Sequence, residues 1–216
     1  MKLRAGFITL AMLVSLVAFS GCTRSLHMTY NPAAYRLPQS DGLRAVALGV
    51  AKLEDRRAWI DRTEPQSLAY VMQQGSWKFG LTHQGKEYVP VQDLVQAILI
   101  DEFKRAGLEQ VTAIPEVLTK DAVPAMRTAA EQQRLGYVLG GRIHIFEIVN
   151  EVGAWTVTSR RAVSSGEGMG VMHSTNVDRL MNTVFRQVVT SVVEQVAAKL
   201  ALAPRDVRVR LVWAGR

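Results

Sequence analysis

The residue with the most distinctive chemistry in this chain is Cys22, which carries the only thiol among 216 residues. A thiol can form a disulfide, attack a substrate or accept a lipid. A single cysteine cannot form a disulfide within one chain. The small residues Ser20 and Gly21 directly before it are typical of a signal-peptide cleavage site. These neighbours favour lipid attachment to Cys22, and the alternative is an ordinary secretory signal beside an unrelated cysteine.

The residues before Cys22 have the order of an export signal. Lys2 and Arg4 form a basic start, and an apolar run follows over residues 7–19. A membrane-spanning helix needs about 20 predominantly apolar residues, and this run ends before that length. We therefore expect residues 1–21 to be a cleaved signal peptide.

Residues 19–22, Phe-Ser-Gly-Cys, resemble the lipobox of bacterial lipoproteins. The resemblance implies cleavage between Gly21 and Cys22, transfer of a diacylglycerol to the Cys22 thiol, and acylation of the new amine with a fatty acid such as palmitate. Each buried methylene of an acyl chain contributes about 0.8 kcal/mol, so two or three chains give lasting attachment. The first expected partner of the chain is therefore a membrane, bound through Cys22.

Thr23 indicates which membrane is expected. In well-studied Gram-negative bacteria, an Asp directly after the lipidated Cys retains a lipoprotein at the inner membrane, so Thr23 implies the periplasmic face of the outer membrane. Loss of Lys2 and Arg4 with the signal lowers the formal charge of +7 by two, to +5. A modestly basic periplasmic chain can meet anionic lipid heads, lipopolysaccharide phosphates or acidic proteins, and we expect no nucleic acid as partner.

The mature chain divides into a tether and a domain. Proline, glycine and the absence of apolar periodicity give residues 22–43 the composition of a lipidated tether. A flexible chain of about 20 residues has a root-mean-square span near 25 Å. Tyr30 and Tyr35 could instead dock on the domain and shorten that reach. Residues 44–216 are enough for a single periplasmic domain with one core.

Other residue types with catalytic potential lack the spacing that a site requires. The histidines form neither a helical pair nor a Cys/His metal pattern; they are His27, His83, His144 and His173. The glycines of residues 166–170 lack the spacing of a dinucleotide fingerprint, and no Gly-x-Ser-x-Gly elbow is present. We therefore expect no catalytic residue, no metal and no cofactor.

A basic loop is the first candidate contact surface. Arg56, Arg57 and Arg62 surround Trp59 in a charged segment after the first strand of the domain. Such a loop could contact a lipid headgroup region or a protein partner. The alternative is that Trp59 folds back over the open end of the core while the arginines are solvated.

The last strand offers a second basic surface. Arg208 and Arg210 alternate with Val207, Val209 and Leu211, which predicts a half-buried strand with one basic face. These arginines could contact lipid phosphates, or they could protect an edge strand from pairing with another chain.

The apolar periodicity predicts an α+β domain. The run 45–51, directly after Arg44, is apolar on both faces and predicts a strand in the middle of a sheet. The other expected strands are 67–73, 76–82, 108–114, 137–151, 155–163 and 205–216, and the expected helices are 90–106, 124–135 and 176–202. We expect a mostly antiparallel sheet with two or three helices packed on one face.

Three segments together resemble a known family. These are Asp55-Arg56 after the apolar strand, the helix 90–106 ended by Gly107, and the segment 136–143, Gly-Tyr-Val-Leu-Gly-Gly-Arg-Ile. Their order resembles the YajG group of bacterial envelope lipoproteins and, more loosely, the periplasmic α/β domains of LpoB and CsgG. The resemblance covers roughly residues 44–150. It implies a related fold and an envelope location, and it implies no activity.

These observations lead to one expected function and two alternatives. We expect a non-catalytic, lipid-anchored periplasmic lipoprotein that binds a protein partner in a cell-envelope complex. The first alternative is an auxiliary lipoprotein of an envelope lipid or lipopolysaccharide transporter. The second, supported least, is an envelope hydrolase. The sequence does not indicate an oligomeric state.

Overall fold

The computed structural model describes residues 23–27, 30, 44–74, 77–119, 121–151, 154–159, 163–167, 174–202 and 210–214. The helices in these ranges are η1 (Pro65–Ala69, a 3-10 helix), α3 (Val91–Arg105), α4 (Val123–Gln132) and α5 (Ser174–Leu202). The strands are β1 (Thr23–His27), β2 (Ala47–Lys52), β3 (Glu54–Asp55), β4 (Tyr70–Gln74), β5 (Trp77–His83), β6 (Lys86–Glu87), β7 (Gln110–Val117), β8 (Tyr137–Ile143), β9 (Phe146–Glu151), β10 (Ala154–Ser159), β11 (Val163–Glu167) and β12 (Arg210–Ala214).

The main sheet is parallel. Its strand order is β12–β8–β2–β7, each neighbouring pair runs parallel, and β3 continues along β8. The expectation of a mostly antiparallel sheet is therefore wrong. An apolar pattern identifies strands but not their direction. Here α3 and α4 lie in the connections that lead to β7 and β8, and a crossover through a helix brings the next strand back parallel.

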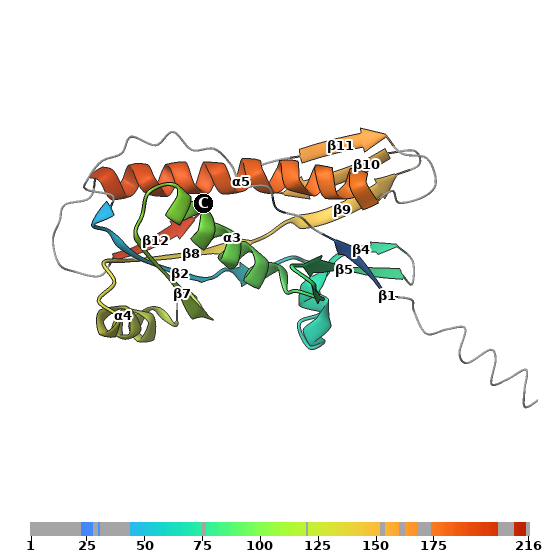
Figure 1. The fold of residues 1–216 in the computed structure, drawn as a ribbon. Coiled ribbons are helices and arrows are strands. Elements are labelled where there is room, and N and C mark those ends of the chain that lie inside the picture. Colours follow the sequence, from blue (N-terminus) through green and yellow to red (C-terminus); the bar gives the residue numbers. More distant parts are fainter. Residues whose placement is uncertain are drawn as a thin grey trace, which may run out of the picture.

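Helices cover both faces of the main sheet (Figure 1). On one face α3 and α5 pack over Leu48 and Leu139, and on the other face α4 packs through Met126 against Ala51 and Val138. The expectation that the helices lie on one face is therefore also wrong. Alternate side chains of β2 point to opposite sides of the sheet, so burial on both faces explains why the run 45–51 is apolar throughout.

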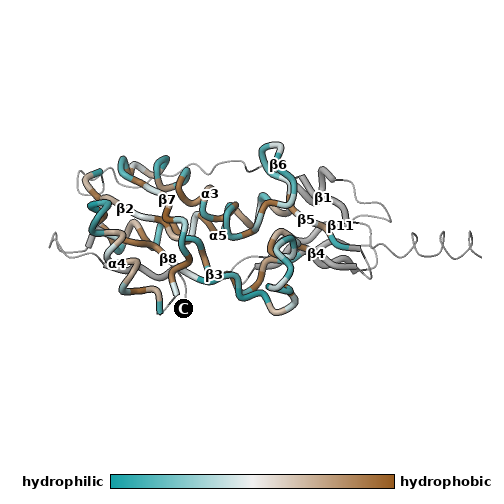
Figure 2. The backbone as a smooth tube through the Cα atoms, turned by 90° about the horizontal axis from the view of Figure 1, so that it is seen from below, coloured by the Kyte–Doolittle hydropathy of each residue, from teal (hydrophilic) through white to brown (hydrophobic). Residues whose placement is uncertain are grey.

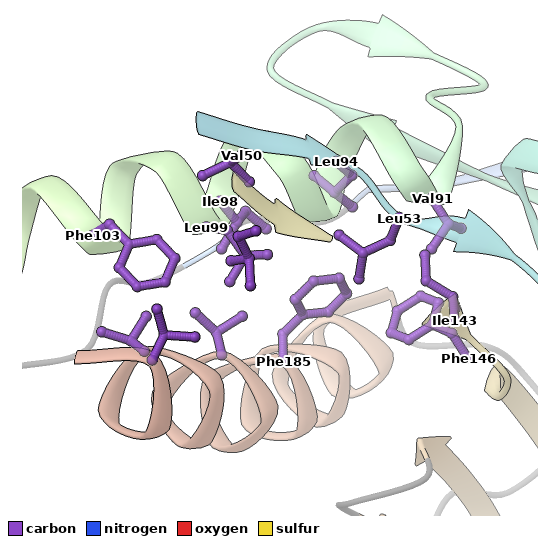
Figure 3. Packing of buried hydrophobic residues seen from close by; sticks show 14 of the residues in the cluster. Val50, Leu53, Val91, Leu94, Ile98, Leu99, Phe103, Ile143, Phe146 and Phe185 are labelled. Carbon is purple, nitrogen blue, oxygen red and sulfur yellow. The ribbon is translucent and has the colours of Figure 1, made fainter. Parts of the chain in front are cut away.

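The larger core lies between α3, α5 and the main sheet. In Figure 3, Ile98, Leu99 and Phe103 of α3 and Phe185 of α5 point into the same space. All four side chains are buried. Burying a large apolar side chain contributes about 1.5–3 kcal/mol. This packing explains how a helix as rich in valine as α5 is held, since valine itself is a weak helix former.

The polar side chain of Gln96 ties α3 to the main sheet from inside this core. Gln96 is buried, and its Nε2 atom donates hydrogen bonds to the carbonyl oxygens of Val50 and Ile114, each at 2.7 Å. These carbonyls belong to β2 and β7, whose pairing becomes irregular after Ala51. One amide group therefore satisfies two buried acceptors at the place where the strand ladder is disturbed.

Two smaller sheets extend the molecule beyond the main sheet. In one, β9, β10 and β11 are antiparallel, and in the other, β5 pairs with β4 and β6 antiparallel and with β1 parallel. Residues 137–151 were expected to be one strand. They form β8 and β9, which are separated by His144 and Ile145 and belong to different sheets.

Candidate functional site

The strand β1 begins at the residue that directly follows Cys22. It pairs with β5 over five residues, from Thr23 opposite Lys78 to His27 opposite Thr82. Gly21 and Cys22 themselves lie outside the described residues. Within residues 22–43, which were expected to be a lipidated tether, Thr23–His27 thus form a strand that pairs with the domain. Apolar periodicity does not indicate this strand, because β1 contains a single large apolar residue, Leu26.

Tyr30 connects the same N-terminal segment to the core. Its ring lies 6.4 Å from the ring of Phe185 in an edge-to-face arrangement, and Phe185 in turn lies 4.8 Å from Phe146. Edge-to-face aromatic pairs contribute about 0.5–1.5 kcal/mol beyond their buried area. Tyr30 therefore docks on the domain, which was one of the two expectations for it, and Tyr35 lies outside the described residues.

Arg57 of the predicted basic loop is buried rather than available to a partner. Only 1% of its side chain is exposed, and it forms an ion pair with Asp55, with Nη2 at 2.7 Å from Oδ2. The Arg57 Nε atom also donates to both carboxylate oxygens, at 3.0 and 3.1 Å. A buried charge is tolerated when it is paired and hydrogen-bonded in this way.

The remaining donors of Arg57 bind backbone carbonyls of three separate segments. Nη1 donates to the carbonyl oxygens of Tyr70 and Phe146, and Nη2 donates to that of Leu68 at 2.9 Å. Since a guanidinium has five N–H groups, every one of them has an acceptor. Arg57 thereby joins β3, β4, η1 and β9 at the junction between the main sheet and the two smaller sheets.

Arg62 and Trp59 also contribute to this junction. Arg62 donates from Nε to the carbonyl oxygen of Asp55 and from Nη2 to that of Arg57, at 3.2 and 3.1 Å. The half-buried Trp59 ring lies 5.6 Å from the guanidinium carbon of Arg57, within range of a cation–π contact. Trp59 thus folds back onto the domain. The expected solvation of the arginines is wrong for Arg57 and partly wrong for Arg62.

The charged group of Arg56 reaches the surface, and 54% of its side chain is exposed. Its Nη2 atom lies 2.6 Å from Oε1 of Glu54, and Arg142 Nε lies 3.1 Å from Oε2 of the same carboxylate. The hydrogen bond from Arg56 is the main reason that the pKa of Glu54 lies below its usual value. These three side chains line the carboxyl ends of β3 and β8. Two residues after the end of β8, Ile145 is exposed, and 39% of its surface is accessible.

A second polar group joins Lys78 of β5 to Glu64 and to Tyr70 of β4. Lys78 Nζ is 3.1 Å from Glu64 Oε2 and 5.2 Å from the centre of the Tyr70 ring. The hydrogen bond to Glu64 raises the pKa of Lys78, and burial raises the pKa of Tyr70. Because Glu64 precedes η1, this contact fixes the segment after the basic loop against β5.

The second predicted basic surface is largely outside the described residues. Arg208 is not among them, and only the backbone of Arg210 is described. Arg210 begins β12 and pairs with Tyr137 of β8, at one edge of the main sheet. The strand over 205–216 was therefore predicted in the right place, and its described part is the shorter range Arg210–Ala214.

No group of three or more His, Cys, Asp or Glu side chains in the described part of the chain is placed to hold a metal ion. None of the described helices combines the length and apolar character needed to cross a membrane.

Sequence reasoning missed Asp55 as the partner of Arg57. The available signal for this ion pair was an acidic residue, Asp55, that lies two positions before Arg57 and follows a buried strand.

Comparison of the chain with protein-family models, with curated proteins and with solved structures gave no match in any of the three.

Proposed function

We propose that this protein is a lipid-anchored lipoprotein on the periplasmic face of the outer membrane, similar to the YajG group, that binds a protein partner in a cell-envelope complex without catalysing a reaction. The observation that carries the proposal is the position of β1. Cys22 is the last residue of the lipobox-like segment, and it is bonded directly to Thr23. Thr23 is the first residue of β1, which pairs with β5. A lipid on Cys22 would therefore be coupled to the folded domain.

The polar groups of the domain support a binding role. The carboxyl ends of β2 and β8 mark the place where the strand order of the main sheet reverses, and open α/β sheets commonly bind ligands at such a place. Here that place is occupied by Asp55 and Arg57, whose charges satisfy each other. The surface next to it carries the Glu54, Arg56 and Arg142 group and the exposed Ile145, which suit contact with another protein.

The anchor is tested by mass spectrometry and fractionation of the protein from a Gram-negative host. The wild-type chain should begin at Cys22, carry acyl chains on that residue and sediment with the outer membrane. Cys22→Ala should lose the acyl mass and leave the membrane fraction. Thr29→Ala, a control outside the lipobox, should behave as the wild type. Equal membrane association of Cys22→Ala and the wild type, with no difference in acyl mass, would contradict the proposal.

The partner is tested by photocrosslinking in intact cells. A photoreactive amino acid in place of Ile145 should capture one envelope protein, whereas the same amino acid in place of the exposed Gln195 on α5 should not. Capture of subunits of a lipid or lipopolysaccharide transporter would favour the auxiliary-lipoprotein alternative. A hydrolase activity of the purified domain without any captured protein would contradict the binding role.

A further inference from the structure

On the face of the main sheet that α4 covers, the side chains of β8 change from buried to exposed. Alternate residues of a strand point to the same face, so Val138, Gly140 and Arg142 share this one. Val138 belongs to the core under α4, and Leu118 packs over Gly140. Arg142, however, is exposed, so the apolar cover stops before it. Figure 2 shows β3, which pairs with this part of β8, away from α4 and coloured as hydrophilic.

The strand β3 and the residue after it add two charged side chains to the uncovered part of this face. Glu54 is paired with Arg142, and Asp55 is paired with Ile143. Asp55 and Ile143 are buried, so Glu54 and Arg142 point to the opposite face of the sheet. The ion pair between Arg56 and Glu54 places the Arg56 guanidinium on that face as well. These charged side chains are therefore held by the ladder between β3 and β8.

Glu54 orients the guanidinium of Arg56 and leaves most of its donors available. Nη2 lies 2.6 Å from Glu54 Oε1, and more than half of the Arg56 side chain is exposed. Within the described residues, this guanidinium has no other hydrogen-bond or ion-pair partner. A guanidinium has five N–H groups, so donors remain for the two parallel hydrogen bonds with which arginine binds a carboxylate. The orientation set by Glu54 lowers the entropy cost of that binding.

Ile145 adds an exposed apolar side chain close to Arg56. The Arg56 amide donates to the carbonyl oxygen of Ile143 at 2.8 Å, and Ile145 follows Ile143 by two residues, which span at most about 7 Å. In the described part of the chain, Ile145 is the exposed large hydrophobic residue, with 39% of its surface accessible. The buried centre of a protein interface is mainly apolar, and arginine is enriched there. Ile145 and Arg56 thus have the residue types of such a centre.

We propose that Arg56, Arg142 and Ile145 form a docking surface for an acidic segment of the protein partner. A carboxylate of that segment binds Arg56 beside Glu54, and a neighbouring apolar side chain covers Ile145. The proposal rests on the binding role proposed above and adds the chemistry of the partner. Two arginines and one glutamate give the surface a net positive charge, which complements an acidic segment. An anionic membrane instead attracts clusters of several Lys and Arg, whereas here a carboxylate lies between the two arginines.

Photocrosslinking through position 145 of the full chain in intact cells tests the chemistry of the partner when the captured molecule is analysed by mass spectrometry. We expect a peptide in which Asp or Glu residues lie next to an apolar residue. A basic or uncharged peptide would overturn the acidic segment and leave the binding role intact. Capture of a lipid or of lipopolysaccharide would assign the surface to a membrane and overturn the proposal. If position 145 captures nothing, the binding role and the acidic segment fail together.

Charge substitutions test whether Arg56 takes part in the contact. With the photoreactive residue at position 145, Arg56→Glu should lower the crosslinking yield at least about fivefold, because like charges then face each other. Arg56→Met removes the charge alone and should give an intermediate yield. Arg127→Glu, which reverses an exposed arginine on α4, should leave the yield unchanged. Circular dichroism of both Arg56 variants should match that of the wild type, so that a lower yield reports binding. Equal yields from Arg56→Glu and Arg127→Glu would overturn the proposal.

Discussion

The guanidinium of Arg57 lies against both carboxylate oxygens of Asp55, two residues earlier in the chain, and almost nothing of either side chain is exposed. The pair lies at the carboxyl end of β3. Arg57 also donates hydrogen bonds to three carbonyl oxygens of residues outside the main sheet. Its loss should therefore affect the whole domain rather than one loop.

Arg57→Met should lower the free energy of unfolding by about 3–5 kcal/mol, because it leaves the buried Asp55 carboxylate without its partner. Urea unfolding of the domain followed by circular dichroism measures the change. The matched control is Arg56→Met, which removes an exposed ion pair and should cost less than about 1 kcal/mol. Equal costs for the two variants would show that the burial of Arg57 does not matter.

Gln96→Leu should destabilise the domain although it increases the apolar character of the core. The substitution leaves the carbonyl oxygens of Val50 and Ile114 without the donor from α3, and an unsatisfied buried polar group costs about 1–3 kcal/mol. Thermal unfolding should show a lower midpoint than in the wild type. Gln132→Leu, at an exposed position of α4, serves as the control and should change the midpoint little.

Glu102→Leu should raise the stability of the domain. Glu102 lies in α3 with no exposed surface, and neither carboxylate oxygen has a hydrogen-bond partner in the described structure. Arg105 Nε lies 3.9 Å from Glu102 Oε1, and the Arg105 side chain is mostly exposed. Replacing such a carboxylate with an apolar side chain of similar size removes its desolvation penalty, a gain of about 1–3 kcal/mol in urea unfolding.

Glu131→Leu on α4 is the control for Glu102→Leu, because Glu131 is exposed and its replacement should change stability within about 0.5 kcal/mol. If Glu102→Leu is less stable than the wild type, the carboxylate must contribute an interaction that favours folding.

Glu54 should make a small contribution to the pH dependence of stability. Its pKa in the folded state is lowered, mainly by the hydrogen bond from Arg56, so its contribution is present above the ordinary value of 4.5 and disappears as the pH falls through the folded-state pKa. Between pH 7 and pH 3 the wild type should lose more stability than Glu54→Gln. The difference should stay below about 1 kcal/mol because both arginine partners are partly exposed.

Parallel urea titrations at the two pH values measure this difference. Equal losses in the wild type and in Glu54→Gln would show that the lowered pKa of Glu54 does not contribute to folding.

Local features of the fold could be predicted from the sequence. The helix 90–106 was predicted within one residue of α3, since Pro90 precedes it and Gly107 follows with a φ of 101°. The strand predicted from the apolar run 45–51 was correctly placed inside a sheet, between β8 and β7. Strand direction was not predictable, because a parallel strand and a buried antiparallel strand share the same apolar pattern, and the path of the helices decides between them.

The junction at Arg57 was predictable only in part. A loop with three arginines around a tryptophan has the composition of a contact surface. Whether one of these arginines is buried depends on hydrogen-bond acceptors that are distant in sequence. The carbonyl oxygen of Phe146, for example, is 89 positions away from Arg57. Only the tertiary structure brings such acceptors together. The proximity of β1 to β5 was hidden for the same reason, because five polar-rich residues reveal no pairing partner.

Gly140 tests how closely the second face of the main sheet is packed. A Cβ atom at this position of β8 would overlap Cδ2 of Leu118 and lie 2.8 Å from its Cβ, so Gly140→Ala should force the two apart and cost about 1–3 kcal/mol in urea unfolding. Gly136→Ala is the matched control, since its nearest contact would be the Ala47 carbonyl oxygen at 3.7 Å. Because the clash involves the Leu118 side chain, adding Leu118→Ala to Gly140→Ala should cost less than the sum of the two single changes. Additive costs would place the strain in the backbone of β8 instead.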